Sequence, residues 1–334
     1  MDACAISKYY LESTGDKTDR TSEIEALLKE NGACLLGTGV FYVSGVKMPE
    51  NSALMGMGPA TQVILDESVE EGYAVRLASR CTVRDLFLLG SAEPLPYPET
   101  LGERHGLVFE GTATSDNWRA TMGEQPKTSI IEACQFRYFS GGAITCRKTG
   151  YSTSASLTVS DCHAMYCGCG VYIPRFSEYH EFTNILCSEN LYGCINNGGN
   201  NVFVNCGFNS NKTAFIMDNR DGLANNNSHG SVIGCTFNHS DNNTGIGIGI
   251  YGAYSGHVFS GCQVFYSKII LENSDAIVFN SFNFGRNSEI EVTGGTLTMF
   301  TNCAFAAEPK ITVTDNDKVK FLNCFTRDGE PVTL

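Results

Sequence analysis

The chain lacks several features that would assign it to a common class of binding protein. Only 18% of its 334 residues are charged, and 23 Lys+Arg stand against 36 Asp+Glu, a formal net charge of -13. Nucleic-acid binding relies on basic side chains that displace counterions, so we expect no nucleic-acid partner. No apolar run approaches the roughly 18 residues of a membrane span, so we expect no membrane insertion. The N-terminus has neither the basic nor the apolar region of a secretory signal, so we expect none.

Cysteine, in contrast, is abundant, with 15 residues, and glycine reaches 35. An odd number of cysteines in a chain for which no signal peptide is expected disfavours a disulfide framework. We therefore expect reduced thiols that are buried as small apolar side chains.

The cysteines mark an internal repeat. A short phrase, usually a cysteine preceded by Asn, Asp or Gly and often followed by Phe, recurs at intervals that average about 24 residues. The phrase is centred on Cys134, Cys162, Cys187, Cys206, Cys235, Cys262, Ser281, Cys303 and Cys324. A period of this kind with insertions of variable length is typical of a solenoid.

A second apolar segment follows most of the phrases. These segments are short, rich in β-branched or aromatic residues and bounded by Gly, Asn, Asp or Ser, which indicates strands. They are residues 143–146, 171–173, 214–217, 245–251, 268–272, 289–293 and 310–314. Equivalent strands of successive repeats would pair in parallel about 4.8 Å apart and stack their Cys and Phe side chains. The sequence thus predicts an all-β fold, a single-stranded right-handed parallel β-helix.

The first third of the chain predicts a capped end for this solenoid. Residues 19–30 have an apolar face at Ile24, Leu27 and Leu28, and Ser22 with Glu25 forms a candidate capping box. Apolar segments at 34–36, 40–43, 53–56, 63–65, 74–77 and 86–89 predict the first coils. We expect an N-terminal segment with a capping helix over 1–33 and a β-helix domain over 34–334. Loops are predicted near 91–104 and 113–127, the second of which carries Trp118.

The N-terminal motifs resemble those of a known superfamily. The segment Gly15-Asp16-Lys17-Thr18-Asp19-Arg20-Thr21, the helix after it, Gly39–Val43 and Leu54–Gly58 follow one another in the chain. This order resembles the pectate-lyase-like β-helix superfamily, in particular its branch of bacteriophage tailspikes and preneck appendages. Lys17 and Arg20 depart from the usual pattern of that branch.

The resemblance implies a function as well as a fold. It implies a homotrimer, a bacterial surface polysaccharide or oligosaccharide as ligand, and a place on a virion tail or the bacterial extracellular surface. A cytoplasmic location is the alternative. The superfamily includes lyases, hydrolases, epimerases, fructotransferases and non-catalytic binders, so the resemblance does not choose among these activities.

The second strands also predict a surface column. If their apolar residues Ile144, Cys146, Phe215, Met217, Ile269 and Leu271 point inward, the next positions point outward. These outward positions are Arg147, Arg175, Asp218 and Glu272. Amides and rings are expected beside them, and such a surface suits a carbohydrate. The expected substrate contacts are Arg147, Arg175, Tyr172, Asn196, Asn197, Arg220, His229, Tyr251, Glu178 and Glu181.

Paired carboxylates are the candidate catalytic groups. Inverting glycosidases hold theirs about 6.5–9.5 Å apart and retaining ones about 5–5.5 Å. Asp218 and Glu272, two coils apart at about 10 Å, lie at the edge of the inverting range. Asp218 with Asp221, separated by Arg220, is a closer pair. A turn held by Asn and Asp side chains is the structural alternative.

No metal or cofactor is expected. The carboxylates form no calcium-cage pattern, and His163 beside Cys162 lacks a standard zinc spacing. The favoured function is a tailspike-like glycan depolymerase of the glycoside hydrolase type. The alternatives are a non-catalytic glycan-binding spike or adhesin, and a polysaccharide lyase, epimerase or fructotransferase of the same fold.

Overall fold

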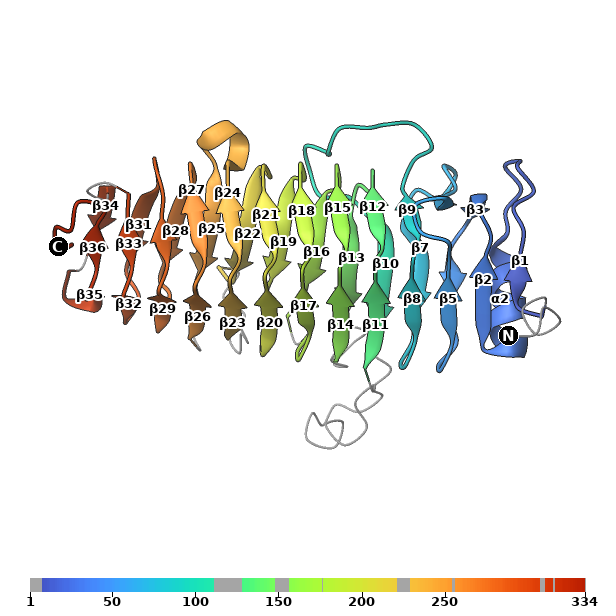
Figure 1. Cartoon of the computed structure of the whole chain (residues 1–334), viewed down its shortest axis with the longest axis horizontal. Helices are drawn as coiled ribbons and strands as arrows, with labels where there is room; N and C mark the ends of the chain where they lie inside the picture. The colour runs from blue at the N-terminus through green and yellow to red at the C-terminus, as the bar shows by residue number, and fades with distance from the viewer. Residues whose placement is uncertain are drawn as a thin grey trace. The chain divides into compact units, whose positions relative to one another are not determined.

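The computed structural model describes residues 8–110, 128–147, 156–175, 177–220, 229–253, 256–306, 310–314 and 316–333. It consists of two compact units, Met1–Tyr172 and Ile173–Leu334. In each unit the chain coils repeatedly through three stacks of parallel strands, which we name sheets A, B and C in the order in which each coil visits them (Figure 1). This is the right-handed parallel β-helix that the sequence predicts.

The strands of the first unit fall into these three stacks. Sheet A contains β1 (Tyr10–Leu11), β2 (Ala33–Leu36), β5 (Ala53–Met55), β8 (Thr82–Arg84), β11 (Ser129–Glu132) and β14 (Leu157–Ser160). Sheet B contains β3 (Gly39–Val43), β6 (Thr61–Leu65), β9 (Phe87–Leu89), β12 (Gln135–Arg137) and β15 (His163–Met165). Sheet C contains β4 (Val46–Lys47), β7 (Gly72–Leu77), β10 (Arg104–Glu110), β13 (Gly142–Arg147) and β16 (Cys169–Ile173).

The second unit follows the same plan. Sheet A contains β17 (Glu181–Thr183), β20 (Asn201–Val204), β23 (Gly230–Ile233), β26 (His257–Ser260), β29 (Ile277–Asn280), β32 (Thr298–Thr301) and β35 (Val319–Leu322). Sheet B contains β18 (Leu186–Ser188), β21 (Gly207–Asn209), β24 (Thr236–Asn238), β27 (Gln263–Phe265), β30 (Asn283–Phe284), β33 (Ala304–Phe305) and β36 (Phe325–Thr326). Sheet C contains β19 (Tyr192–Asn196), β22 (Thr213–Asp218), β25 (Ile246–Tyr251), β28 (Lys268–Glu272), β31 (Glu289–Thr293) and β34 (Lys310–Val313). Two short 3₁₀ helices lie in the connections between described strands, η1 (Ser240–Asn243) between β24 and β25 and η2 (Asn316–Lys318) between β34 and β35.

A single residue in the left-handed region turns the chain from sheet A to sheet B. In Asn205, Asn302 and Asn323, for example, φ lies between 53° and 56°. Asn and Gly tolerate this conformation better than other residues, which explains why they precede the cysteine in the repeated phrase. The turns of equivalent coils have the same conformation at Asp85, Ala133, Asp161, Asn184, Gly234, Gly261 and Ser281.

The cysteines that follow these turns are buried and stack, as predicted. All 14 described cysteines are free thiols with buried side chains. Cys206, Cys235 and Cys262 belong to successive coils, and each backbone N–H of Cys206 and Cys235 donates to the sulfur of the next coil. Two assignments were wrong. Ile185, which follows the turn at Asn184, occupies the stacked position, and Cys187 lies inside β18, paired with Phe208. Ser281 is itself the turn residue of its coil, and the buried Phe282 after it occupies the stacked position.

Phenylalanine rings form the second internal ladder. In sheet A of the second unit, Phe259, Phe279 and Phe300 stack with centroids 5.1 Å apart and interplanar angles of 14° and 8°. All three rings are fully buried. Each aromatic ring removes a large apolar area from water, so the ladder contributes much of the stability of this unit.

The N-terminal helix differs from its prediction in detail. Helix α2 (Thr21–Asn31) buries Ile24 and Leu28, packs against β2 and β4, and ends at Gly32 with φ 69°. The predicted capping box was wrong, because the N-cap residue is Arg20 and no side chain caps the helix. Glu25 instead accepts a hydrogen bond from the backbone N–H of Lys47 at 2.8 Å. The strand β1 precedes the helix and pairs with β2.

The loops agree with expectation where they are described. Residues 90–103 connect β9 to β10 without a helix or strand. The second predicted loop, 113–127 with Trp118, lies outside the described residues.

We predict that replacing Phe259 by Ala lowers the free energy of unfolding by about 3–5 kcal/mol, because it leaves a cavity in a stacked core. The matched control is Val258→Ala on the same strand, where the side chain is 39% exposed and the cost should stay within about 0.5 kcal/mol. Urea denaturation followed by circular dichroism measures both. Equal costs for the two variants would contradict the ladder.

Candidate functional site

The outer face of sheet C in the second unit carries the predicted carboxylates. Asp218, Tyr251 and Glu272 are the last residues of β22, β25 and β28, and the strand registers pair Asp218 with Tyr251 and Tyr251 with Glu272. The residues before them, Met217, Ile250 and Leu271, are buried in the core. The alternation of the strand therefore directs all three polar side chains outward, as predicted for Asp218 and Glu272.

The membership of the column needs one correction. Tyr251, expected beside the column, is a member of it. It lies on β25, between β22 with Asp218 and β28 with Glu272. Arg175, expected in the column, lies in the turn after β16 instead. Two strand spacings place the backbones of Asp218 and Glu272 roughly 10 Å apart.

Arg220 connects two members of this column. Its Nε donates to Asp218 Oδ1 at 2.9 Å, and its second terminal nitrogen forms an ion pair with Oδ2. The guanidinium carbon also lies 4.1 Å from the centroid of the Tyr251 ring. The ring is thus covered and only 7% exposed, whereas 54% of the Arg220 side chain is exposed. The planar guanidinium, stacked on Tyr251, forms the outer surface at this point.

The electrostatic effect on Asp218 follows from these contacts. The hydrogen bond from the Arg220 side chain lowers the pKa of Asp218, and burial opposes it to a smaller extent. Arg175 adds a further favourable charge. Asp218 is therefore ionised at neutral pH.

The two asparagines predicted beside the column have different roles. Asn197 is half-buried, and its Oδ1 accepts a hydrogen bond from the backbone N–H of Asp218 at 2.8 Å. This contact fixes the backbone that carries the carboxylate. Asn196 is fully buried, and its Oδ1 accepts a hydrogen bond from Asn201 Nδ2 at 3.0 Å. The expectation that Asn196 faces substrate was therefore wrong.

Glu178 and His229 lie on connections from sheet C to sheet A, and Glu181 lies where such a connection enters sheet A. Glu178 Oε2 accepts a hydrogen bond from Asn200 Nδ2 at 3.3 Å, and Glu181 is the exposed first residue of β17. His180 between them is buried against Ser177, which lowers its pKa to about 3. His229 precedes β23, and its carbonyl accepts a hydrogen bond from the N–H of Asn200. Asp221 lies outside the described residues.

Arg147 and Tyr172 belong to a second polar cluster, which lies on sheet C of the first unit. Arg147 ends β13 beside Glu110 of β10, and one of its terminal nitrogens lies 3.8 Å from Glu103 Oε2. Burial raises the pKa of Tyr172, and the charge of Glu103 adds to this effect. Glu103 therefore lies near both predicted residues.

His105 holds Glu103 in this cluster. Its Nδ1 accepts a hydrogen bond from the backbone N–H of Gly142 at 2.9 Å, which leaves the ring proton on Nε2. Nε2 lies 3.4 Å from Glu103 Oε2. Burial lowers the pKa of His105, with a further contribution from Arg147, so the ring is neutral at pH 7. Sequence analysis missed Glu103 and His105, although Glu103 directly precedes and His105 lies within β10, the strand that pairs with 142–147.

In the described ranges no three or more His, Cys, Asp or Glu side chains gather where they could hold a metal ion. Within those ranges, no helix is both long and apolar enough to cross a membrane.

Comparisons with known proteins show the fold. No known family profile and no curated protein sequence matches the chain. The A-module of the Azotobacter vinelandii mannuronan C-5 epimerase AlgE4 is similar in structure, with 14% identity, 97% of each chain covered and a TM-score of 0.70.

Two further structures come from different kinds of protein. The enzymatically active domain of bacteriophage CBA120 tailspike protein 2 has 14% identity and a TM-score of 0.59 over 93% of this chain and 45% of that one. The Streptococcus pneumoniae surface adhesin PfbA has 11% identity and a TM-score of 0.61 over 95% of this chain and 91% of that one. Identities this low show a shared fold and nothing finer, and they confirm the predicted parallel β-helix.

We predict that Arg220→Gln raises the pKa of Asp218 toward the ordinary value of about 3.9, because the charged donor is lost. The carboxyl carbon shifts of labelled aspartate, followed by NMR against pH, measure this change. Asp66 of the first unit serves as the internal control, since Ser68 lowers its pKa through hydrogen bonds. If Asp218 titrates at the same pH in both proteins, the pair does not form in solution.

Proposed function

We propose that this protein is a carbohydrate-active β-helix protein that cleaves a bacterial surface polysaccharide on the outer face of sheet C in its second unit. The observation that carries the proposal is the register of Asp218, Tyr251 and Glu272 on three successive strands. It sets two carboxylates on either side of an aromatic residue, on backbones roughly 10 Å apart. Inverting glycoside hydrolases hold their carboxyl groups about 6.5–9.5 Å apart, so the two side chains must lean toward each other to reach that range.

The charges suggest how the two carboxylates share the work. An inverting reaction needs one ionised carboxylate to activate water and one carboxylic acid to protonate the leaving oxygen. Asp218 is held ionised by Arg220 and suits the first role. Glu272, whose side chain is half-buried two strands away, is assigned the second. Arg220 lies over Tyr251 between them, where its exposed plane can contact a sugar ring.

The similar structures support a carbohydrate ligand without choosing the reaction. One is a mannuronan epimerase, one is an enzymatically active tailspike domain and one is a surface adhesin. The carboxylate pair and the likeness to two enzymes, the epimerase and the tailspike domain, together favour a tailspike-like depolymerase.

A non-catalytic glycan-binding spike is the second candidate function, and one observation favours it. The Asp218 carboxylate is already bound through both oxygens to Arg220, so it must leave this pair, or work within it, to activate water. A surface built only for binding tolerates such a pair.

We expect Asp218→Asn and Glu272→Gln each to reduce cleavage by about 100-fold or more, the usual contribution of a general acid or base. A panel of purified bacterial capsular polysaccharides, assayed for new reducing ends, identifies the substrate and then measures the variants. Glu189→Gln is the matched control, since this glutamate lies in the turn between β18 and β19, before the start of a sheet C strand, whereas Asp218 and Glu272 lie at the ends of theirs. Full activity in both carboxylate variants would remove Asp218 and Glu272 from the mechanism.

The same assay separates the alternatives. Binding to a polysaccharide without chain shortening supports the adhesin and overturns the hydrolase. Cleavage that creates an unsaturated uronate, detected by its ultraviolet absorbance, identifies a lyase. In that case Glu103→Gln tests the cluster of the first unit, where Arg147 could neutralise a uronate.

A homotrimer on a virion tail is part of the proposal, on the strength of the tailspike resemblance. The expected mass in solution is three times the 36.2 kDa of the chain, measured by light scattering after gel filtration. A mass equal to one chain at micromolar concentration would reject the trimer for this chain.

A further inference from the structure

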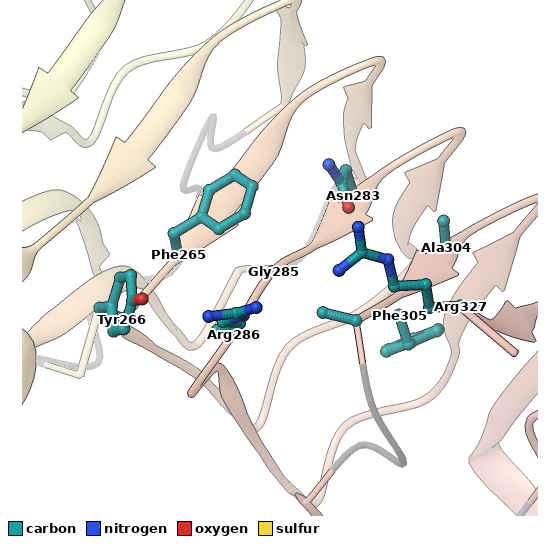
Figure 2. A pocket seen from close by; sticks show the side chains of 9 residues that line it. Phe265, Tyr266, Asn283, Gly285, Arg286, Ala304, Phe305 and Arg327 are labelled. Carbon is teal, nitrogen blue, oxygen red and sulfur yellow. The ribbon is translucent and has the colours of Figure 1, made fainter.

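A groove of about 520 Å³ lies on the outer face of sheet B in the second unit (Figure 2). Its volume falls within the range of roughly 300–1,000 Å³ that is typical of small-molecule sites. Its walls come from β27, β30, β33 and β36 and from the residues that follow these strands. It lies on a different sheet from Asp218 and Glu272 and shares no residue with their column.

The strand registers explain why the surface is hollow at this point. Phe265, Gly285, Ala306 and Arg327 occupy equivalent outward positions in four successive coils. The two small residues between the ring and the arginine leave the space open. A Cβ atom at Gly285 would lie 1.8 Å from the Phe265 ring, so glycine is required for the ring to rest against the backbone.

The chemistry of the groove is cationic and aromatic. Arg286 and Arg327 are exposed, and neither side chain has a hydrogen bond or ion pair with any residue in the described ranges. In the view of Figure 2, Phe265 and Tyr266 lie on one side and Arg327 on the other, with Arg286 between them. Tyr266 is fixed by stacking on His239, with centroids 4.9 Å apart. Two guanidinium groups without a partner among the described residues, in a chain of net charge -13, favour an anionic ligand.

We infer that this groove binds an acidic oligosaccharide. Arg286 and Arg327 bind the carboxylate of a hexuronate residue, because the guanidinium fork matches the two carboxylate oxygens. The ring of Phe265 receives the apolar face of a sugar ring, and Asn283 offers an amide to its hydroxyls. From Phe265 to Arg327 the groove spans three strand spacings, about 14 Å, so it accommodates a short segment of a chain.

This inference goes beyond the proposed function, since binding in the groove requires no cleavage. A protein that holds an acidic polysaccharide on sheet B can retain it whether or not sheet C carries out chemistry. If Asp218→Asn and Glu272→Gln leave cleavage unchanged, the proposed function fails, but the proposed binding in the groove on sheet B does not.

The test is calorimetric titration of the full chain with trigalacturonate, repeated in the Asp218→Asn, Glu272→Gln double variant so that cleavage cannot interfere. We expect Arg286→Gln and Arg327→Gln each to weaken the binding of trigalacturonate about tenfold or more. Both arginine substitutions together should abolish it. Gly285→Val, which fills the groove, should also abolish binding, with circular dichroism to confirm the fold.

Two controls decide the result. Lys320→Gln removes one positive charge from an exposed position of β35 on sheet A and should leave the affinity unchanged. Neutral maltotriose should not bind. Three results would each overturn the inference. They are an affinity of the arginine variants equal to that of the unchanged protein, binding of maltotriose as tight as that of trigalacturonate, or no binding of trigalacturonate. If inorganic sulfate binds in the same titration and trigalacturonate does not, the groove is a simple anion site, and the assignment to a saccharide is overturned.

Discussion

The structure depends on one constraint, the in-register parallel pairing of successive coils. Each coil must close within the same cross-section, so equivalent residues stack at strand spacing. The turn from sheet A to sheet B shows the constraint clearly, because one left-handed residue such as Asn205 or Gly234 makes it. The residue that follows is buried and apolar in every coil, and a thiol meets this requirement as a small apolar side chain. Packing, rather than redox chemistry, therefore explains the cysteines at these turns.

The same constraint creates the two surfaces that we propose as functional. A side chain at an outward position has a neighbour on the strand before it and another on the strand after it, so short columns of different chemistry are built one residue per coil. On sheet C this places Tyr251 between Asp218 and Glu272. On sheet B it places Gly285 next to Phe265 and opens a groove. A single insertion that shifted one register would dismantle either surface.

The two surfaces of the second unit differ in how their charges are satisfied. Arg220 is paired with Asp218 and stacked on Tyr251, so its position and the protonation state of Asp218 are fixed together. Arg286 and Arg327 have no described partner and keep their donors available for a ligand. Preorganised charge suits catalysis, and unsatisfied donors suit binding. The contrast supports a chain in which holding and processing a glycan take place on separate sheets.

The sequence by itself determined the period, the strands of sheets B and C in most coils, the burial of the thiols and the outward direction of Asp218 and Glu272. These features follow from local alternation and from the spacing of repeats, both of which can be read along one chain. Only the tertiary structure decided that Ile185 replaces a cysteine in the ladder, that Tyr251 stands between the carboxylates, and that His105 supports Glu103. Each of these depends on how loops of unequal length bring one coil onto the next, and on side-chain directions across coils. No pattern within a single coil specifies those relations.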